Sequence, residues 1–113
     1  MAVKAVAKNV GVSPRKVRRV LKVVRGQKVA AALEILSFLS TPAAREVAKV
    51  VKSAASNAEN NNMMAQGDLK IVAIHADPGV TLKRTRARSR GRSSKILKRT
   101  SHVTVLVDEE EGS

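Results

Sequence analysis

A run of seventeen residues near the end of the chain limits what this sequence can fold into. Residues 83–99 read KRTRARSRGRSSKILKR and contain nine Lys or Arg and no Asp or Glu. Arginine recurs at every second position from 84 to 92, with only small residues between. In an extended chain this spacing places successive side chains on one face. The run is therefore predicted to be an arginine-lined strand or loop, and it needs a polyanion because it has no apolar face to bury.

The length and charge of the chain narrow its possible partners. With 113 residues it forms one small domain, and a net charge of +13 with a pI near 11.2 favours nucleic acid. No apolar stretch of about 18 residues could span a membrane, and the single aromatic residue, Phe38, cannot form an interfacial belt. The sequence shows no apolar signal-peptide stretch and no cysteine, so we expect no membrane partner and a reducing, cytoplasmic location.

The first third of the chain predicts a strand followed by a basic amphipathic helix. Residues 2–10 are rich in Val and Ala with two lysines between, which is typical of an edge strand. Ser13-Pro14 predicts a helix start, with Ser13 as the N-cap and Pro14 at the first helical position. The helix is expected to run to Arg25 and to end at Gly26, a residue that favours helix termination. The helix has a buried stripe at helical spacing: Val17, Val20, Leu21 and Val24.

The opposite face of this helix is the second candidate binding site. The face carries Arg15, Arg18, Arg19, Lys22 and Arg25. Arg25 agrees with the helix dipole at the C-terminal end, so a structural role is expected for it, whereas Arg15, Lys16 and Arg18 lie at the helix start. Basic residues in a first turn oppose the helix dipole and cost about 0.3–1 kcal/mol each. A phosphate at the helix start would relieve that conflict by binding free backbone N–H groups and basic side chains together. A solvated basic face is the structural alternative.

The remainder predicts two more helices and a hairpin. Residues 29–39 form a short helix, and Thr41-Pro42 opens the longest helix, which ends near Asn60 in an asparagine-rich segment. Residues 68–77 and 96–107 are β-rich and pair, so the basic run lies at the end of their hairpin. The eleven residues from 77 to 88 give an arm of roughly 35 Å at ~3.3 Å each.

No pattern supports catalysis or a cofactor. The sequence has no phosphate-loop motif, nucleophile elbow or paired metal-ligand histidines. His75 and His102 each stand alone in a predicted strand, where a hydrogen-bonded structural role is expected. The scarcity of aromatic residues disfavours base-stacking RNA modules. We therefore expect no enzyme activity, no cofactor and no metal, and recognition through phosphates and shape.

Several motifs together resemble one family in order along the chain. They are SPRKVR at 13–18, RG at 25–26, SAASNAENN at 53–61, KR at 83–84, RGR at 90–92 and KRTSHVTV at 98–105. The chain resembles the bacterial-type ribosomal protein twenty-two family of the large subunit. The resemblance implies an α+β fold: three helices packed on a small three-stranded antiparallel sheet, with a long protruding basic β-hairpin. It also implies a single domain over residues 1–113, with residues 78–98 as the hairpin arm.

The family's role implies a set of partners and site residues for this chain. The body would lie near the exit of the polypeptide tunnel, and the hairpin would enter large-subunit (23S-type) rRNA, opposite ribosomal protein four and beside the nascent polypeptide. The family also acts in early subunit assembly. The location would be the ribosome, cytoplasmic or organellar. From the basic clusters and the resemblance together, the rRNA-binding residues are predicted to be Arg15, Lys16, Arg18, Arg19, Lys22, Asn57, Asn60, Lys83, Arg84, Arg86, Arg88, Arg90, Arg92, Lys95, Lys98 and Arg99. The resemblance implies a tunnel-lining tip of Arg86, Ala87, Arg88, Ser89, Arg90 and Gly91.

A DNA-binding architectural protein with a basic arm is the alternative from a different class. Its partner is also a phosphate polymer, so composition does not separate the two. Minor-groove arms often carry apolar wedges or proline near the tip, and residues 80–92 contain neither proline nor an aromatic residue. A cationic membrane binder would need amphipathic aromatic residues that the chain lacks.

Overall fold

The computed structural model describes residues 2–64, 66–87 and 93–109, and for residues 9, 62, 66, 80–87 and 93–98 the backbone alone. Three helices and three strands follow one another along the chain, as the sequence predicted. They are β1 (Val3–Val10), α1 (Pro14–Val24), α2 (Val29–Phe38), α3 (Pro42–Asn62), the short 3₁₀ helix η1 (Gln66–Asp68), β2 (Leu69–Ala87) and β3 (Ser93–Glu109). The strands form one antiparallel sheet, so the α+β fold class is confirmed.

The helix ends follow the predicted signals with two differences. Gly26, with φ 78°, follows α1, and the Thr41 side chain accepts a hydrogen bond from Ala44 N (3.2 Å) at the start of α3. Ser13 occupies the N-cap position of α1, but its side chain makes no capping hydrogen bond. The longest helix continues through Asn62, and the left-handed residue that ends it is Met63 (φ 55°), not an asparagine.

The order of strands in the sheet is β1-β3-β2, so β3 is central and both other strands are edges. The first pair of the β1–β3 ladder is Val3↔Val107, and the first pair of the β2–β3 ladder is Leu69↔Glu109. Ser101 of β3 pairs with Val10 of β1 and with Pro78 of β2. The β1–β3 ladder shifts its register between Ala7 and Val10, so both ladders are irregular next to Ser101. Pro78 has no N–H to donate to a ladder, and the register shifts between it and Thr81. Ser101 therefore marks the end of the three-stranded part of the sheet.

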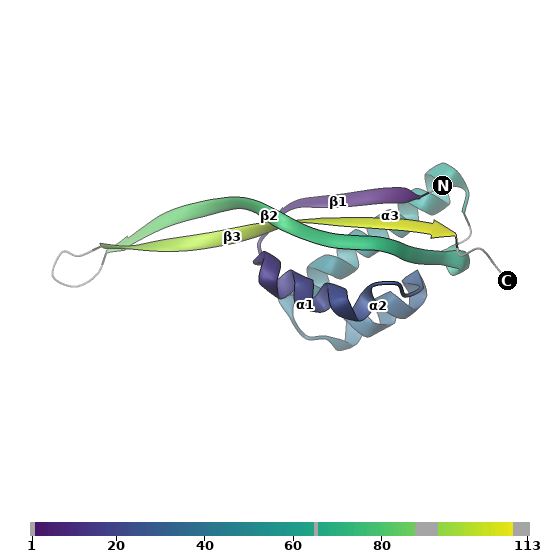
Figure 1. Cartoon of the computed structure of the whole chain (residues 1–113), viewed down its shortest axis with the longest axis horizontal. Helices are drawn as coiled ribbons and strands as arrows, with labels where there is room; N and C mark the ends of the chain where they lie inside the picture. The colour runs from purple at the N-terminus through teal and green to yellow at the C-terminus, as the bar shows by residue number, and fades with distance from the viewer. Residues whose placement is uncertain (1, 65, 88–92, 110–113) are drawn as a thin grey trace.

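Beyond that point β2 and β3 continue as a two-stranded ribbon. Pairing is regular from Thr81↔Arg99 to Ala87↔Ser93, and Figure 1 shows this part extending to the left past β1 and all the helices. The molecule measures 67 × 26 × 17 Å. The connection between the two strands lies outside the described residues. The assignment of residues 78–98 as a separate arm stays a prediction.

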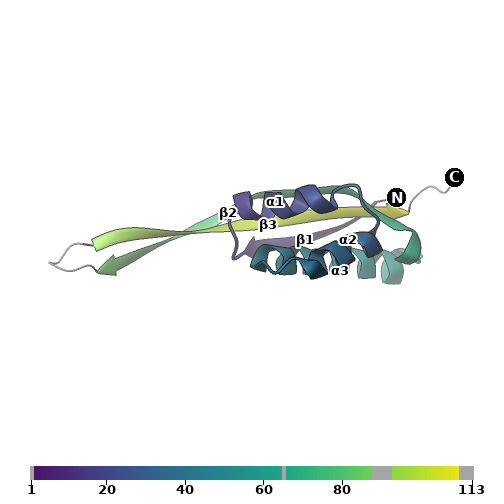
Figure 2. The ribbon, with the colours of Figure 1, turned by 90° about the horizontal axis from the view of Figure 1, so that it is seen from below.

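The hydrophobic core lies between the three-stranded part of the sheet and the helices. Side chains alternate between the two faces along β3, and its buried face carries Val103, Val105 and Val107. These valines form one hydrophobic cluster with the buried stripe of α1 and the buried valines and alanines of α3. In Figure 2 the helices lie along the three-stranded part of the sheet only, and the two-stranded ribbon carries none. The ribbon is thus far from the core that stabilises the body.

Candidate nucleic-acid interface

The predicted basic face of α1 is the first component of the site. Its buried stripe, with Val17, Leu21 and Val24 completely inaccessible to solvent, orients the helix so that the opposite side faces outward. Arg15, Lys16, Arg18, Arg19 and Lys22 are all exposed. The first turn of α1 contains no acidic residue. The Ser13 side chain makes no capping hydrogen bond, so the backbone N–H groups of this turn are uncapped. The helix start therefore presents positive charge and free donors together.

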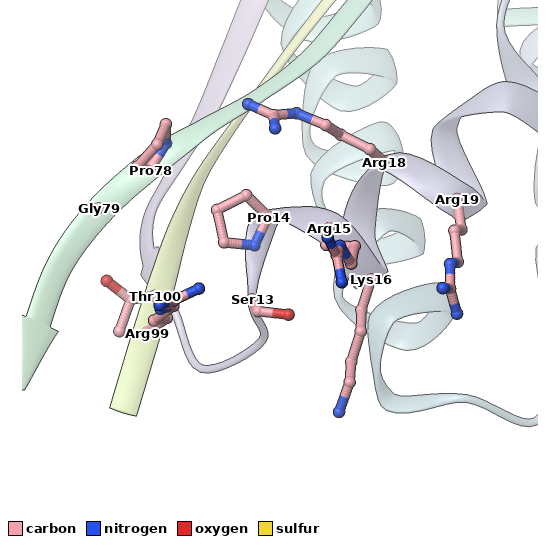
Figure 3. Close-up of a pocket in the computed structure, with 10 residues that line it drawn as sticks. All are labelled: Ser13, Pro14, Arg15, Lys16, Arg18, Arg19, Pro78, Gly79, Arg99 and Thr100. Atoms are coloured by element: carbon pink, nitrogen blue, oxygen red, sulfur yellow. The ribbon is translucent and has the colours of Figure 1, made fainter. Parts of the chain in front are cut away.

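A recess lies between the start of α1 and the base of the two-stranded ribbon. It is lined from three elements: Ser13, Pro14, Arg15, Lys16, Arg18 and Arg19 at the start of α1, Pro78 and Gly79 in β2, and Arg99 and Thr100 in β3 (Figure 3). Five of the predicted rRNA-binding residues thus meet in one place, although Arg15 and Arg99 are 84 positions apart in the sequence. Of the described residues that line the recess, none is acidic.

A neighbouring hollow extends this surface toward α3. It shares Ser13, Lys16, Arg19, Arg99 and Thr100 with the recess and adds Gly11, Val12, Thr41, Pro42 and Ala43. Lys16, Arg19 and Arg99 border both cavities and are exposed. We call the exposed cations Arg15, Lys16, Arg19 and Arg99 the basic cluster. Its four positive charges, with hollows on two sides, suit the phosphate backbone of a nucleic acid.

One buried hydroxyl links the two segments of the chain that carry the basic cluster. Ser101 has no solvent exposure, and its Oγ donates a hydrogen bond to Val12 O at 2.5 Å. This bond attaches the β1–α1 loop, next to the helix start, to the β3 segment that carries Arg99. Ser101 lies in the KRTSHVTV motif, but its contact with Val12 was not predicted, because the two residues are 89 positions apart.

Arg18 in α1 and Arg25, the residue that follows its last turn, bind protein backbone. Arg18 Nε and Nη2 donate to Ala76 O at 3.2 and 2.9 Å, and Arg25 Nη2 donates to Ile74 O at 3.0 Å. In Figure 3 the Arg18 side chain turns toward β2, whereas Lys16 and Arg19 turn away from it. Arg18 was predicted from the sequence to contact phosphate, and no local sequence pattern predicts its hydrogen bonds to Ala76 O.

The remaining predicted site residues lie elsewhere or outside the description. Asn57 is half-buried and Asn60 is exposed near the end of α3. They lie about 22 and about 27 Å along the helix from Pro42 at 1.5 Å per residue. The structure does not bring them into the basic cluster. The backbone of Lys83, Arg84, Arg86, Ala87, Lys95 and Lys98 lies in the paired strands, and their side chains are not described. Arg88, Ser89, Arg90, Gly91 and Arg92 lie outside the described residues.

Other kinds of site have little support in the described part of the chain. Among residues 2–64, 66–87 and 93–109 no group of histidine and acidic side chains is arranged to hold a metal. His75 Nε2 lies 3.9 Å from Asp77 Oδ2 on the exposed side of β2, which is an ordinary surface pair. None of the described helices is long and apolar enough to cross a membrane.

Comparison with known proteins relates the chain to one family. The family model for ribosomal protein L22p/L17e matches residues 5–108. A large ribosomal subunit protein uL22 from Dehalococcoides mccartyi is 53% identical over 107 residues, which is 95% of this chain and 98% of that protein. The uL22 proteins of Herpetosiphon aurantiacus and Desulforamulus reducens are 49% and 50% identical, over 98% and 99% of this chain and 98% and 100% of their own lengths. The chain therefore belongs to the ribosomal protein L22p/L17e family.

Proposed function

We propose that this protein is a structural component of the large ribosomal subunit and binds its rRNA through the basic cluster and the two-stranded ribbon. The observation that carries the proposal is the convergence of Arg15, Lys16, Arg19 and Arg99 at one recess, where none of the described lining residues is acidic. Phosphate contacts of this kind supply affinity and orientation without requiring base-specific groups. Membership of a ribosomal protein family agrees with this role and with a ribosomal location, and such proteins are not enzymes.

The ribbon supports a more detailed proposal about its surroundings. Two paired strands that leave the core at Ser101 and continue to Ala87 and Ser93 have no packing partner among the described elements. With arginines along them, they would be stabilised by insertion between rRNA segments. We propose that the ribbon enters the rRNA and that its end, residues 86–91, lines the polypeptide exit tunnel opposite ribosomal protein four. The nascent chain would pass this end, and RNA contacts made by both parts would serve early assembly.

The dependence of binding on salt tests the electrostatic part of the proposal. If about six phosphates are neutralised, the slope of log K against log salt should be roughly −4 to −5, at ~0.7–0.9 per phosphate. A matched double-stranded DNA of equal length serves as competitor in the same titration. A slope near zero would refute the polyanion interface, and equal affinity for the DNA would favour the architectural DNA-binding alternative.

A pair of double variants tests the location of the interface. Arg15→Ala with Lys16→Ala removes two members of the basic cluster, whereas Arg45→Ala with Lys52→Ala removes two exposed cations from α3. Both lower the net charge by two. At about 0.1 M salt the first should lose roughly 25- to 60-fold in rRNA affinity if counterion release accounts for both contacts. Equal losses in the two variants would mean that net charge alone drives binding and that the cluster is not the site.

A further inference from the structure

Arg18 and Arg25 form a pair that differs from the other cations of α1. They are seven residues apart, about two helical turns, and so lie on one side of the helix. Their acceptors, Ala76 O and Ile74 O, are two residues apart on β2. By contrast, no hydrogen bond to another described residue is found for Arg15 or Arg19. Two cations of the same amphipathic face are thus bound to a strand, while their neighbours remain available to a ligand.

The strand that accepts these bonds is an edge of the sheet. An edge strand has backbone groups on its outer side with no strand partner, and in β2 several of these are satisfied by α1 and the turn after it. Besides the two arginine bonds, Ile71 N donates to Gln27 O at 3.0 Å, and Lys28 forms an isolated bridge with Lys70. The helix is therefore joined to β2 at Arg18, and the segment that follows it is joined to β2 at Arg25, Gln27 and Lys28.

Such hydrogen bonds define the position of α1 along the sheet, which apolar packing alone does not. The buried stripe of α1 drives the association of the helix with the core. Because the hydrophobic effect is non-directional, this burial only weakly determines where along the sheet the helix lies. A guanidinium donating two N–H groups to one carbonyl has a narrow range of positions. The distances at Ala76, 3.2 and 2.9 Å, satisfy both donors at once.

We propose that Arg18 and Arg25 are positioning residues: they hold α1 against the edge of β2 so that Arg15, Lys16 and Arg19 face the recess beside Arg99. This inference rests on the proposed rRNA binding, and it reassigns Arg18, which was predicted to contact rRNA. Arg18 lines the recess and remains exposed, yet its hydrogen bonds are directed at the protein. Its main contribution to RNA affinity is made through the residues that it orients.

Charge-preserving variants separate positioning from direct phosphate contact. Arg18→Lys and Arg25→Lys keep the charge but remove the guanidinium, whereas Arg45→Lys makes the same change at an exposed α3 residue outside the site. The full-length proteins are titrated with a large-subunit rRNA fragment at a temperature where circular dichroism shows all of them folded. We expect Arg18→Lys and Arg25→Lys each to lose about fivefold or more in affinity through coupling to their neighbours, and Arg45→Lys to bind as the parent does.

Two further readouts make the proposal specific. The carbonyl ¹³C resonance of Ala76 should shift in Arg18→Lys and not in Arg45→Lys. In a double-mutant cycle, Arg15→Gln should cost much less affinity in the Arg18→Gln background than in the parent, because a displaced helix no longer presents Arg15. Independent contacts would instead add. If Arg18→Gln does not fold, the cycle is run with Arg18→Lys.

The possible outcomes distinguish this inference from the function on which it rests. If Arg15→Gln weakens binding while Arg18→Lys binds as the parent does, and the cycle is additive, Arg18 is an ordinary phosphate contact and the positioning role is wrong. If neither Arg15→Gln nor Arg19→Gln changes rRNA affinity, the basic cluster is not the interface and both proposals fail.

Discussion

Replacing Ser101 with alanine tests how strongly one hydroxyl joins the sheet to the recess. The side chain is completely buried, and its Oγ donates to Val12 O at 2.5 Å. Alanine removes the donor and keeps the backbone of β3 able to pair with both neighbours. The variant therefore tests the link between β3 and the β1–α1 loop with little other disturbance.

The expected cost follows from the burial of the acceptor. A typical intramolecular hydrogen bond contributes about 0.5–1.5 kcal/mol, and leaving a buried partner unsatisfied costs about 1–3 kcal/mol. Because Val12 is only half-buried and water can reach part of it, we expect a loss of about 2 kcal/mol in the free energy of unfolding. For 113 residues, an unfolding entropy of about 2.1 cal/mol/K per residue converts 1 kcal/mol to about 4 °C. The melting temperature should thus fall by about 8 °C.

A second serine provides the matched control. Ser37 Oγ also donates to a backbone carbonyl, that of Glu34 at 2.6 Å, but it lies exposed on α2. Ser37→Ala should change the free energy of unfolding by no more than about 0.5 kcal/mol. Urea denaturation followed by circular dichroism measures both variants. If Ser101→Ala is as stable as Ser37→Ala, the buried bond does not hold the loop and the reasoning is wrong.

The other predictions concern a helix start, the core and the ribbon. Thr41→Ala should cost about 1 kcal/mol in thermal unfolding and Ser13→Ala much less, because only Thr41 caps its helix through the side chain; equal effects would contradict this. Leu21→Ala should cost about 2–5 kcal/mol in urea denaturation because Leu21 is fully buried in the core, and a change below 1 kcal/mol would refute it. In the free protein, amides of residues 82–86 should exchange with solvent much faster than those of residues 103–107, since an isolated two-stranded hairpin is marginally stable; equal protection would show that the ribbon is self-supporting.

Local signals in the sequence were sufficient to predict the elements of the body. The stripe ending at Val24, the Thr41-Pro42 start and the alternation through Val107 each depend on residues within a few positions of one another. Helical and strand periodicity, capping and the backbone preferences of Gly and Pro act over that range. The end of α3 was predicted less well: asparagines favour termination, yet Met63 adopts the left-handed conformation. The family motifs were also local, and the family assignment was confirmed.

Local sequence patterns thus account for the helices, the strands and the positive charge of the chain. Which of the cations lie together at the recess, and which bind the protein backbone, depends on the tertiary fold. The sheet order β1-β3-β2 places Arg99 beside the start of α1 and leaves β2 as an edge whose carbonyls accept from Arg18 and Arg25. The contacts at Ala76 and Val12 join residues 58 and 89 positions apart. Local periodicity carries no information about such contacts, because they arise only when the whole core packs and fixes the relative positions of its elements.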